Sequence, residues 1–232
     1  MSESGRPYTL AIEGSTYQGS VALFRGVEIV SERTLSADDG GVARAGRGER
    51  LMPAIAECFA EAGLKGDAIA RIVCGSGPGS FTSLRIAGSV AKGLAVGYGV
   101  PLFAVSSLLL SVSGAKPALP PGEYLSVLDA MRDEFFASRI VYRPDTGEHE
   151  LSAVTILSRL DLDDFRATER AVRVVGPGQE IDVHPHARGV ATVLDHVIAS
   201  GAVDLAGWEP DYGRLAEAQV RWEAVHGRPL TA

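Results

Sequence analysis

The first part of the chain consists of short apolar runs separated by tight turns. Apolar and β-branched side chains are concentrated in residues 8–13, 19–24 and 27–33, with turn residues between them. Runs of this length bounded by turns are typical of β-strands, and their short connections favour antiparallel pairing. The pattern therefore predicts an antiparallel meander that opens the fold.

The next part changes to an alternation of helical and strand periods. An apolar stripe predicts a helix that Gly63 ends, and Pro53 is expected to kink or delay its start. A strand at residues 71–74, a helix at residues 80–96 and a strand at residues 101–105 then form a β-α-β unit, which is normally right-handed and parallel. Together with the meander they predict a mixed five-stranded sheet. The stripe of the first helix consists of Leu51, Ile55, Phe59 and Ala62.

A segment rich in proline and glycine, residues 114–122, interrupts this order. It can continue neither element, and we place a domain junction near it, with domains at residues 1–110 and 111–232. The second part repeats the strand, hairpin and helix plan in reduced form, which is the organisation of actin-like ATPases. The sequence thus predicts an α/β fold of the actin-like ATPase (ASKHA, ribonuclease H-like) class, with two α/β domains and mixed sheets. The predicted strands of the second part are residues 124–128, 135–142 and 172–175, and its predicted helices are residues 157–165, 192–199 and 215–225.

Composition limits the partners of this protein. Hydrophobic residues make up 46% and charged residues 22% of the 232 residues, which is the balance of a globular protein. A net charge of −7 disfavours autonomous binding to nucleic acid, because such binding draws on basic patches, so RNA contact is expected to need a partner. No run approaches the ~20 apolar residues of a membrane span, and the first residues lack the apolar region of a secretory signal. We therefore expect a cytoplasmic protein without membrane contact.

A glycine-rich loop carries the strongest chemical signal in the chain. Gly77 and Gly79 lie between a predicted strand and a predicted helix, where they remove side chains that would hold a ligand away. Ser80 or Thr82 is placed to cap the free amides of the first helical turn. These features fit an anion cradle and a plain capped turn equally well. The Gly-Lys-Ser/Thr ending of a Walker loop is missing, which argues against a nucleoside-triphosphate switch.

Several motifs resemble those of one protein family. The stretch Gly77-Pro78-Gly79-Ser80-Phe81-Thr82-Ser83-Leu84-Arg85 resembles the signature Gly-Pro-Gly-Ser-Phe-Thr-Gly-Leu-Arg, and Ala91-Lys92-Gly93-Leu94-Ala95 resembles its sequel Ala-Lys-Gly-Leu-Ala. The opening Leu10-Ala11-Ile12-Glu13-Gly14-Ser15-Thr16 is similar to Leu-Ala-Ile-Asp-Thr-Ser-Thr. These are motifs of the TsaB (YeaZ) family, the glycoprotease (M22)-like dimerisation subunits of bacterial tRNA threonylcarbamoyladenosine biosynthesis. The chain resembles that family nearly end to end.

The chain also departs from the family pattern. Glu13 replaces the aspartate, Gly14 the threonine after it, Ser83 the last glycine of the signature, and Arg47-Gly48 a His-Ser pair. Glu13 keeps a carboxylate where an actin-like ATPase would hold magnesium, but the added methylene moves it by about a bond length. Such departures are expected of a divergent member or a paralogue.

The resemblance implies a non-catalytic scaffold that forms a homodimer when alone and dimerises with a TsaD homologue. TsaD would transfer a threonylcarbamoyl group to adenosine 37 of tRNAs that read ANN codons. A TsaE ATPase is a further candidate partner, tRNA is reached only through the complex, and ATP or ADP is expected only at the complex interface. TsaD-type metal binding needs a His-x-x-x-His pair, so no metal is expected here. The histidines, none of them spaced in that way, are His149, His184, His186, His196 and His226.

Two groups of residues are candidate sites. The two helices of the first domain form the implied partner interface, because their small side chains let a neighbouring helix approach closely. The alternative is that this stripe packs on the protein's own sheet. The phosphate-loop-like residues are Glu13, Ser15, Thr16, Gly77, Gly79, Ser80 and Thr82. The interface residues are Leu51, Ile55, Leu84, Arg85, Ala87, Gly88, Ala91, Lys92 and Ala95.

A second functional class stays open from the sequence. An actin-like-fold enzyme, either an ATP-dependent phosphotransferase or an M22-like peptidase, would use Glu13, Thr16 and the loop at residues 77–82. The serines near this loop have no histidine close in sequence to act as a base, so no catalytic residue is assigned.

Overall fold

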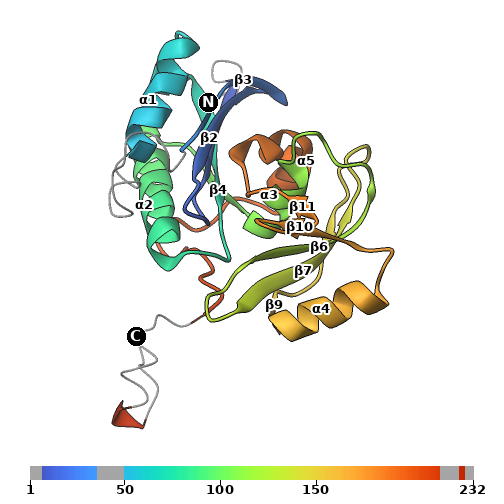
Figure 1. The fold of residues 1–232 in the computed structure, drawn as a ribbon. Coiled ribbons are helices and arrows are strands. Elements are labelled where there is room, and N and C mark those ends of the chain that lie inside the picture. The colour runs from blue at the N-terminus through green and yellow to red at the C-terminus, as the bar shows by residue number, and fades with distance from the viewer. Residues whose placement is uncertain (1–6, 36–49, 215–224, 228–232) are drawn as a thin grey trace.

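The computed structural model describes residues 7–35, 50–214 and 225–227 of the chain, and it contains two mixed sheets (Figure 1). The first sheet has the strand order β3-β2-β1-β4-β5. Strands β1, β2 and β3 pair antiparallel, while β4 and β5 run parallel to β1, so the predicted mixed five-stranded sheet is confirmed. Its strands are β1 (Tyr8–Glu13), β2 (Ser20–Arg25), β3 (Glu28–Thr34), β4 (Ile69–Gly75) and β5 (Leu102–Val105).

The second sheet has the order β11-β10-β6-β7-β8, and β9 also pairs with β7. The prediction of a helix from residue 157 was wrong at its start, because Thr155–Ser158 pairs with β7 as β9. Helix α4 (Arg159–Thr168) begins only after Ser158, whose side chain accepts the Asp161 N–H in a capping box. The strands are β6 (Gly122–Asp129), β7 (Glu134–Tyr142), β8 (Glu150–Leu151), β9 (Thr155–Ser158), β10 (Arg173–Gly176) and β11 (Ile181–Asp182).

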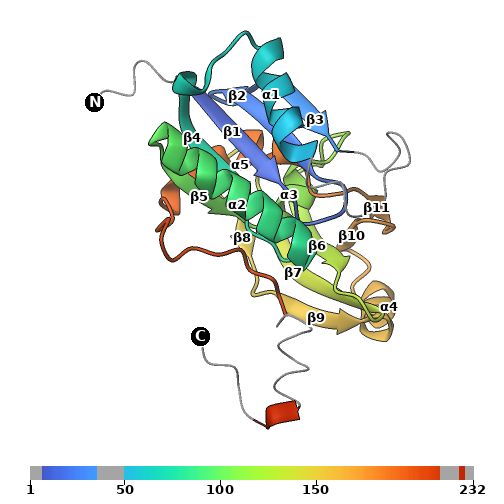
Figure 2. The ribbon, with the colours of Figure 1, turned by 90° about the vertical axis from the view of Figure 1, so that its left-hand side faces the viewer.

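The helices form layers outside and between the two sheets. Helices α1 (Leu51–Glu61) and α2 (Phe81–Tyr98) lie side by side on the outer face of the first sheet (Figure 2). Helices α3 (Ser107–Ser113) and α5 (Val190–Ala199) lie between the sheets, and α4 covers the outer face of the second (Figure 1). Pro53 does not delay α1, since it lies in the first turn, where the amides have no partner within the helix.

Three hydrophobic clusters follow from this layering. One lies between the first sheet and helices α1 and α2, and another lies between the second sheet and α4. The central cluster joins both halves, with Phe24 from β2, Leu108 from α3, Tyr124 from β6 and Val193 from α5. The domain boundary at residues 110 and 111 stays a prediction, and its position lies within α3. Arg47-Gly48 and most of the predicted helix at residues 215–225 lie outside the described residues.

A short polar junction adds to the central cluster. The 3₁₀ helix η5 (Ala187–Gly189) follows β11, and the Ala187 N–H donates to the Ser20 hydroxyl of β2 at 2.9 Å. His186 is buried, and its Nδ1 accepts the Arg188 N–H at 3.0 Å. Burial and the neighbouring Arg188 charge lower the pKa of His186 to about 4, so the ring is neutral at pH 7.

This junction makes stability depend on pH. Unfolded His186 titrates near pH 6.5, and the folded ring titrates near pH 4. The contribution of the neutral ring is therefore fully present above pH 6.5 and is lost as the pH falls to 4, by about 3 kcal/mol at most. Urea unfolding at pH 7, 6, 5 and 4 measures this loss in the free energy of unfolding.

The His186→Asn variant keeps an acceptor near the Nδ1 position but does not titrate, so its stability should fall less between pH 6.5 and 4. Burial also lowers the pKa values of His149 and His184, and for this reason the difference between wild type and variant is the quantity to compare. Identical pH profiles for the two proteins would contradict the assignment.

Candidate functional site

A buried carboxylate lies at the end of β1. Glu13 is 1% exposed, its Oε1 accepts the Ser15 N–H at 2.5 Å, and its Oε2 accepts the Ser107 hydroxyl at 2.9 Å. Burial raises the pKa of Glu13 above its usual value, although the hydrogen bonds from Ser15 and Ser107 act in the opposite direction. The carboxyl group is thus enclosed by donors of its own chain.

Glycines make room for this arrangement. A Cβ at Gly75 would overlap the Glu13 carboxylate, and a Cβ at Gly14 would lie 2.6 Å from the Cβ of Ala87 on α2. The threonine expected at position 14 from the family pattern would therefore collide with α2. The Glu13 and Gly14 departures fit this packing, because the longer acid reaches Gly75 while the missing side chain lets the loop rest on the helix.

The glycine-rich loop is also bound to its own chain. The Gly77 N–H donates to the Ser107 hydroxyl at 3.1 Å, and the Ser80 N–H donates to the Ser15 carbonyl at 2.7 Å. A Cβ at Gly79 would overlap that same carbonyl oxygen. Sequence reasoning missed Ser107, and the only signal for it was a serine shortly after the last strand of the β-α-β unit.

The predicted phosphate-loop residues are only partly brought together. Glu13, Ser15, Gly79 and Ser80 are neighbours, as the hydrogen bonds above show. The Thr16 hydroxyl instead bonds the backbone of Gln18 within its own turn. Thr82 is exposed on the first turn of α2.

Ser80 is the N-cap residue of α2, but its side chain makes no capping hydrogen bond, so the expected capping role was wrong. The Ser80 oxygen instead accepts the Ser83 hydroxyl at 3.1 Å. Binding of phosphate at this loop stays a prediction.

The small-residue stripe of α2 faces inward. Ala87, Ala91 and Ala95 are buried against the first sheet, together with Leu51 and Ile55 of α1. The stripe therefore packs on the protein's own sheet, which was the alternative to a partner interface in the sequence analysis. Leu84 is buried as well, and its side chain lies beside Gly77 of the glycine-rich loop. Gly88 is buried as well, and a Cβ there would lie 3.0 Å from Pro210. Among the predicted interface side chains, Arg85 is exposed and Lys92 is half-buried.

Residues 203–214, here named the C-terminal strap, cross from α2 to the second sheet (Figure 2). Lys92 Nζ donates to the Trp208 carbonyl at 2.9 Å, and the Asp211 N–H donates to the Ser76 carbonyl at 2.7 Å. The ring of Tyr212 lies 4.6 Å from that of Phe81, and Arg214 pairs with Glu134 of β7. The strap therefore covers part of α2 and the start of the glycine-rich loop.

Two mixed sheets with a helix pair between them define an α/β protein of the actin-like ATPase class. A family model described as TsaD, tRNA N6-adenosine threonylcarbamoyltransferase, matches residues 28–159. The chain belongs to that family and, within it, to the TsaB (YeaZ) proteins. Among the described residues, no helix has the length and apolar character needed to cross a membrane.

Three relatives support the assignment. The tRNA threonylcarbamoyladenosine biosynthesis protein TsaB of Bacillus subtilis is 26% identical over 229 residues, which cover 92% of this chain and 96% of that protein. The protein of the same name from Haemophilus influenzae is 32% identical over 147 residues, covering 60% and 57%. The solved structure of YeaZ from Pseudomonas aeruginosa has a TM-score of 0.70 at 24% identity, covering 88% of this chain and 99% of its own, and it shows the fold.

Gly75 leaves no room for a side chain beside the Glu13 carboxyl group. Gly75→Ala should lower the free energy of unfolding by about 1–3 kcal/mol, because the new methyl group collides with the Glu13 carboxylate. Urea denaturation followed by circular dichroism measures this. Gly93→Ala on α2 is the control, since a Cβ there meets nothing within 4 Å, and it should not destabilise the protein.

Glu13→Ala combined with Gly75→Ala removes the colliding group. The double variant should therefore be destabilised by less than the sum of the single variants, with a coupling on the order of 1 kcal/mol. Additive effects would show that Gly75 is not constrained by Glu13.

Proposed function

We propose that this chain is a non-catalytic scaffold subunit in tRNA threonylcarbamoyladenosine biosynthesis. In this proposal it dimerises with a TsaD homologue, which transfers the threonylcarbamoyl group to adenosine 37 of tRNAs reading ANN codons. The names of the curated relatives and the match to the TsaD family model support the pathway. A TsaE ATPase and ATP or ADP belong to the complex in this proposal, and the protein acts in the cytoplasm.

The observation that carries the non-catalytic role is the enclosure of Glu13. An acid that holds magnesium must offer its oxygens to the metal, whereas both oxygens of Glu13 accept hydrogen bonds from Ser15 and Ser107. The Gly77 and Ser80 amides, which would cradle a phosphate, donate to the chain itself. This favours a scaffold over the enzyme of the actin-like class.

The outward faces of α1 and α2 are the surface on which we place the partner. Val96 is 68% exposed on α2, and Arg85 lies eleven positions earlier, about three helical turns away and so on nearly the same face. Met52 of the adjacent α1 is 47% exposed. This surface combines exposed apolar side chains with one cation, and it would also serve the homodimer formed without a partner.

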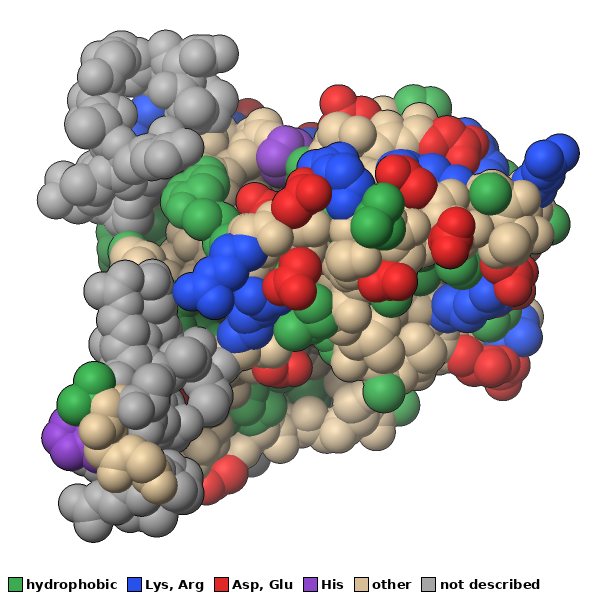
Figure 3. All heavy atoms as spheres, turned by 60° about the horizontal axis from the view of Figure 1, so that its bottom comes forward, with side chains coloured by type: hydrophobic (Ala, Val, Ile, Leu, Met, Phe, Trp, Pro, Cys, Tyr) green, Lys and Arg blue, Asp and Glu red, His purple; other side chains and the backbone are tan. Residues whose placement is uncertain are grey.

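Contact with tRNA is proposed to run through the partner. The net charge of the chain is −7. On the face seen in Figure 3, acidic and basic side chains are interspersed, and they do not form a single basic patch. Nucleic-acid backbones are bound chiefly by clustered cations, which supports an indirect contact.

Co-purification with the TsaD homologue of the same organism tests the proposal. Size-exclusion chromatography with light scattering should show a heterodimer for the wild type. Val96→Asp and Arg85→Glu should each weaken it by about tenfold or more, since a buried charge or a reversed charge is costly at an interface. Val27→Asp is the matched control, because Val27 is 63% exposed in the turn between β2 and β3, and it should bind as the wild type does.

Two results would contradict the proposal at different levels. Absence of any complex with the TsaD homologue, together with unchanged threonylcarbamoyladenosine in tRNA after deletion of the gene, would reject the scaffold function. A complex that resists both substitutions on α2 would keep the function but reject this surface.

A further inference from the structure

A hollow of about 290 Å³ opens at the polar junction between the two halves of the molecule. Its wall includes Thr34 at the end of β3, Lys116 after α3, and His184 and Arg188 from the segment around η5. The volume is at the lower end of the range for small-molecule sites, which is about 300–1,000 Å³. A small polar ligand fits this space better than a large one.

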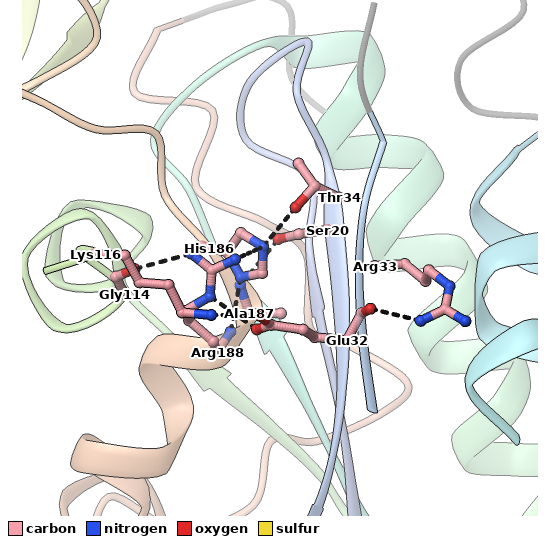
Figure 4. A network of polar contacts seen from close by, with 9 residues as sticks. All are labelled: Ser20, Glu32, Arg33, Thr34, Gly114, Lys116, His186, Ala187 and Arg188. Carbon is pink, nitrogen blue, oxygen red and sulfur yellow. Dashed lines mark hydrogen bonds and ion pairs between the residues drawn. The ribbon is translucent and has the colours of Figure 1, made fainter. Parts of the chain in front are cut away.

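Two cations share one carboxylate at this hollow (Figure 4). Lys116 Nζ lies 2.6 Å from Glu32 Oε1, and Arg188 Nε lies 2.8 Å from Glu32 Oε2. Burial alone would raise the pKa of Glu32, but the hydrogen bonds and charges of Arg188 and Lys116 outweigh it and leave the pKa below the usual value. Glu32 is therefore ionised, and it neutralises only one of the two cations.

The guanidinium of Arg188 is incompletely satisfied. Its side chain is 18% exposed, and its Nη2 faces the Nε2 of His186 at 2.8 Å, as Figure 4 shows. The Nδ1 of His186 accepts the Arg188 N–H, so the ring proton must lie on Nε2. That Nε2–H can donate to the Thr34 hydroxyl at 2.9 Å, but it cannot accept from Arg188.

One other bond of the Arg188 amino groups reaches the described residues, from Nη1 to the Gly114 carbonyl at 3.4 Å. Nη2 therefore has no protein acceptor in the part of the chain that the structure describes. A largely buried guanidinium edge without an acceptor is costly, and an anionic oxygen is its strongest partner.

Two neighbours are placed to complete an anion site. His184 lines the hollow, and within the described residues its ring makes no hydrogen bond. Lys116 is 61% exposed and uses one of its three N–H donors on Glu32. Asp182 also lines the hollow, and its Oδ1 accepts the Gly178 N–H at 2.8 Å. Its negative charge repels an anion, so the ligand is expected beside Arg188 and Lys116.

We propose that the hollow binds a small anion, with a carboxylate or phosphate group held between Nη2 of Arg188 and Nζ of Lys116 and with His184 at its side. The ligand would connect the end of β3 to the segment that follows β11. This site is separate from Glu13 and from the outward faces of α1 and α2. The proposal therefore does not depend on complex formation.

Titration of the full-length chain with inorganic phosphate and, separately, with acetate tests the site. Calorimetry gives the affinity, and nitrogen-detected NMR of the histidine rings reports on His184 and His186. Sodium chloride at equal ionic strength is the reference. A saturable response to phosphate identifies a phosphate site, a saturable response to acetate alone identifies a carboxylate site, and either supports the proposal.

Substitutions locate the ligand without removing Arg188, whose loss could prevent folding. Lys116→Gln and His184→Ala should each weaken binding, the former by about tenfold, because a charge-assisted hydrogen bond is lost. Lys65→Gln is the control, since Lys65 is exposed near η4 (Gly66–Ala68) and does not line the hollow. A response no different from that of chloride, or binding unchanged in both variants, would overturn the proposal.

Discussion

The enclosure of one carboxyl group constrains the loops at one end of the first sheet. Glu13 stands at the carboxyl end of β1 and needs donors, because a buried acid without hydrogen bonds would be strongly destabilising. It obtains them from Ser15, in the loop that follows, and from Ser107, at the start of α3. Ser107 in turn accepts the Gly77 N–H and donates its own N–H to the Gly77 carbonyl, so the glycine-rich loop is fixed by the same group.

This constraint shapes the possible function of the molecule. Three backbone amides around the first strand have acceptors within the chain: Ser15 donates to the Glu13 carboxyl group, Gly77 to the Ser107 hydroxyl and Ser80 to the Ser15 carbonyl. The C-terminal strap adds a second layer, since a Cβ at Gly77 would overlap the Asp211 carbonyl oxygen. A protein with the loop closed in this way keeps the outer helices as its accessible surface, which is consistent with a scaffold.

Much of the fold could be predicted from the sequence, because short apolar strands bounded by tight turns leave a clear pattern. Helix α3 could not, since six of its seven residues, serines among them, are buried, and a short segment buried on all sides has no amphipathic helical period. Residues 157 and 158 were wrongly predicted as helix because pairing with β7, a long-range contact, decides their conformation. The stripe of small residues on α2 was recognised, but a sequence cannot tell whether such a stripe meets its own sheet or a partner. Ser107 escaped notice because its partners Glu13 and Gly77 are distant in sequence.

The buried polar groups at Glu13 and at Arg188 obtain their hydrogen-bond partners in different ways. A charged or polar group that packing removes from water needs partners within the chain or from a ligand. At Glu13 the carboxyl group is enclosed by donors of the chain, and the packing around the glycines beside it is tight. At Arg188 the shared carboxylate of Glu32 is insufficient, and a hollow remains beside the unsatisfied edge. A closed site needs no ligand for stability, but an open site at which two cations share one carboxylate does benefit from one. The second site is therefore where a small molecule would act on the arrangement of the two halves.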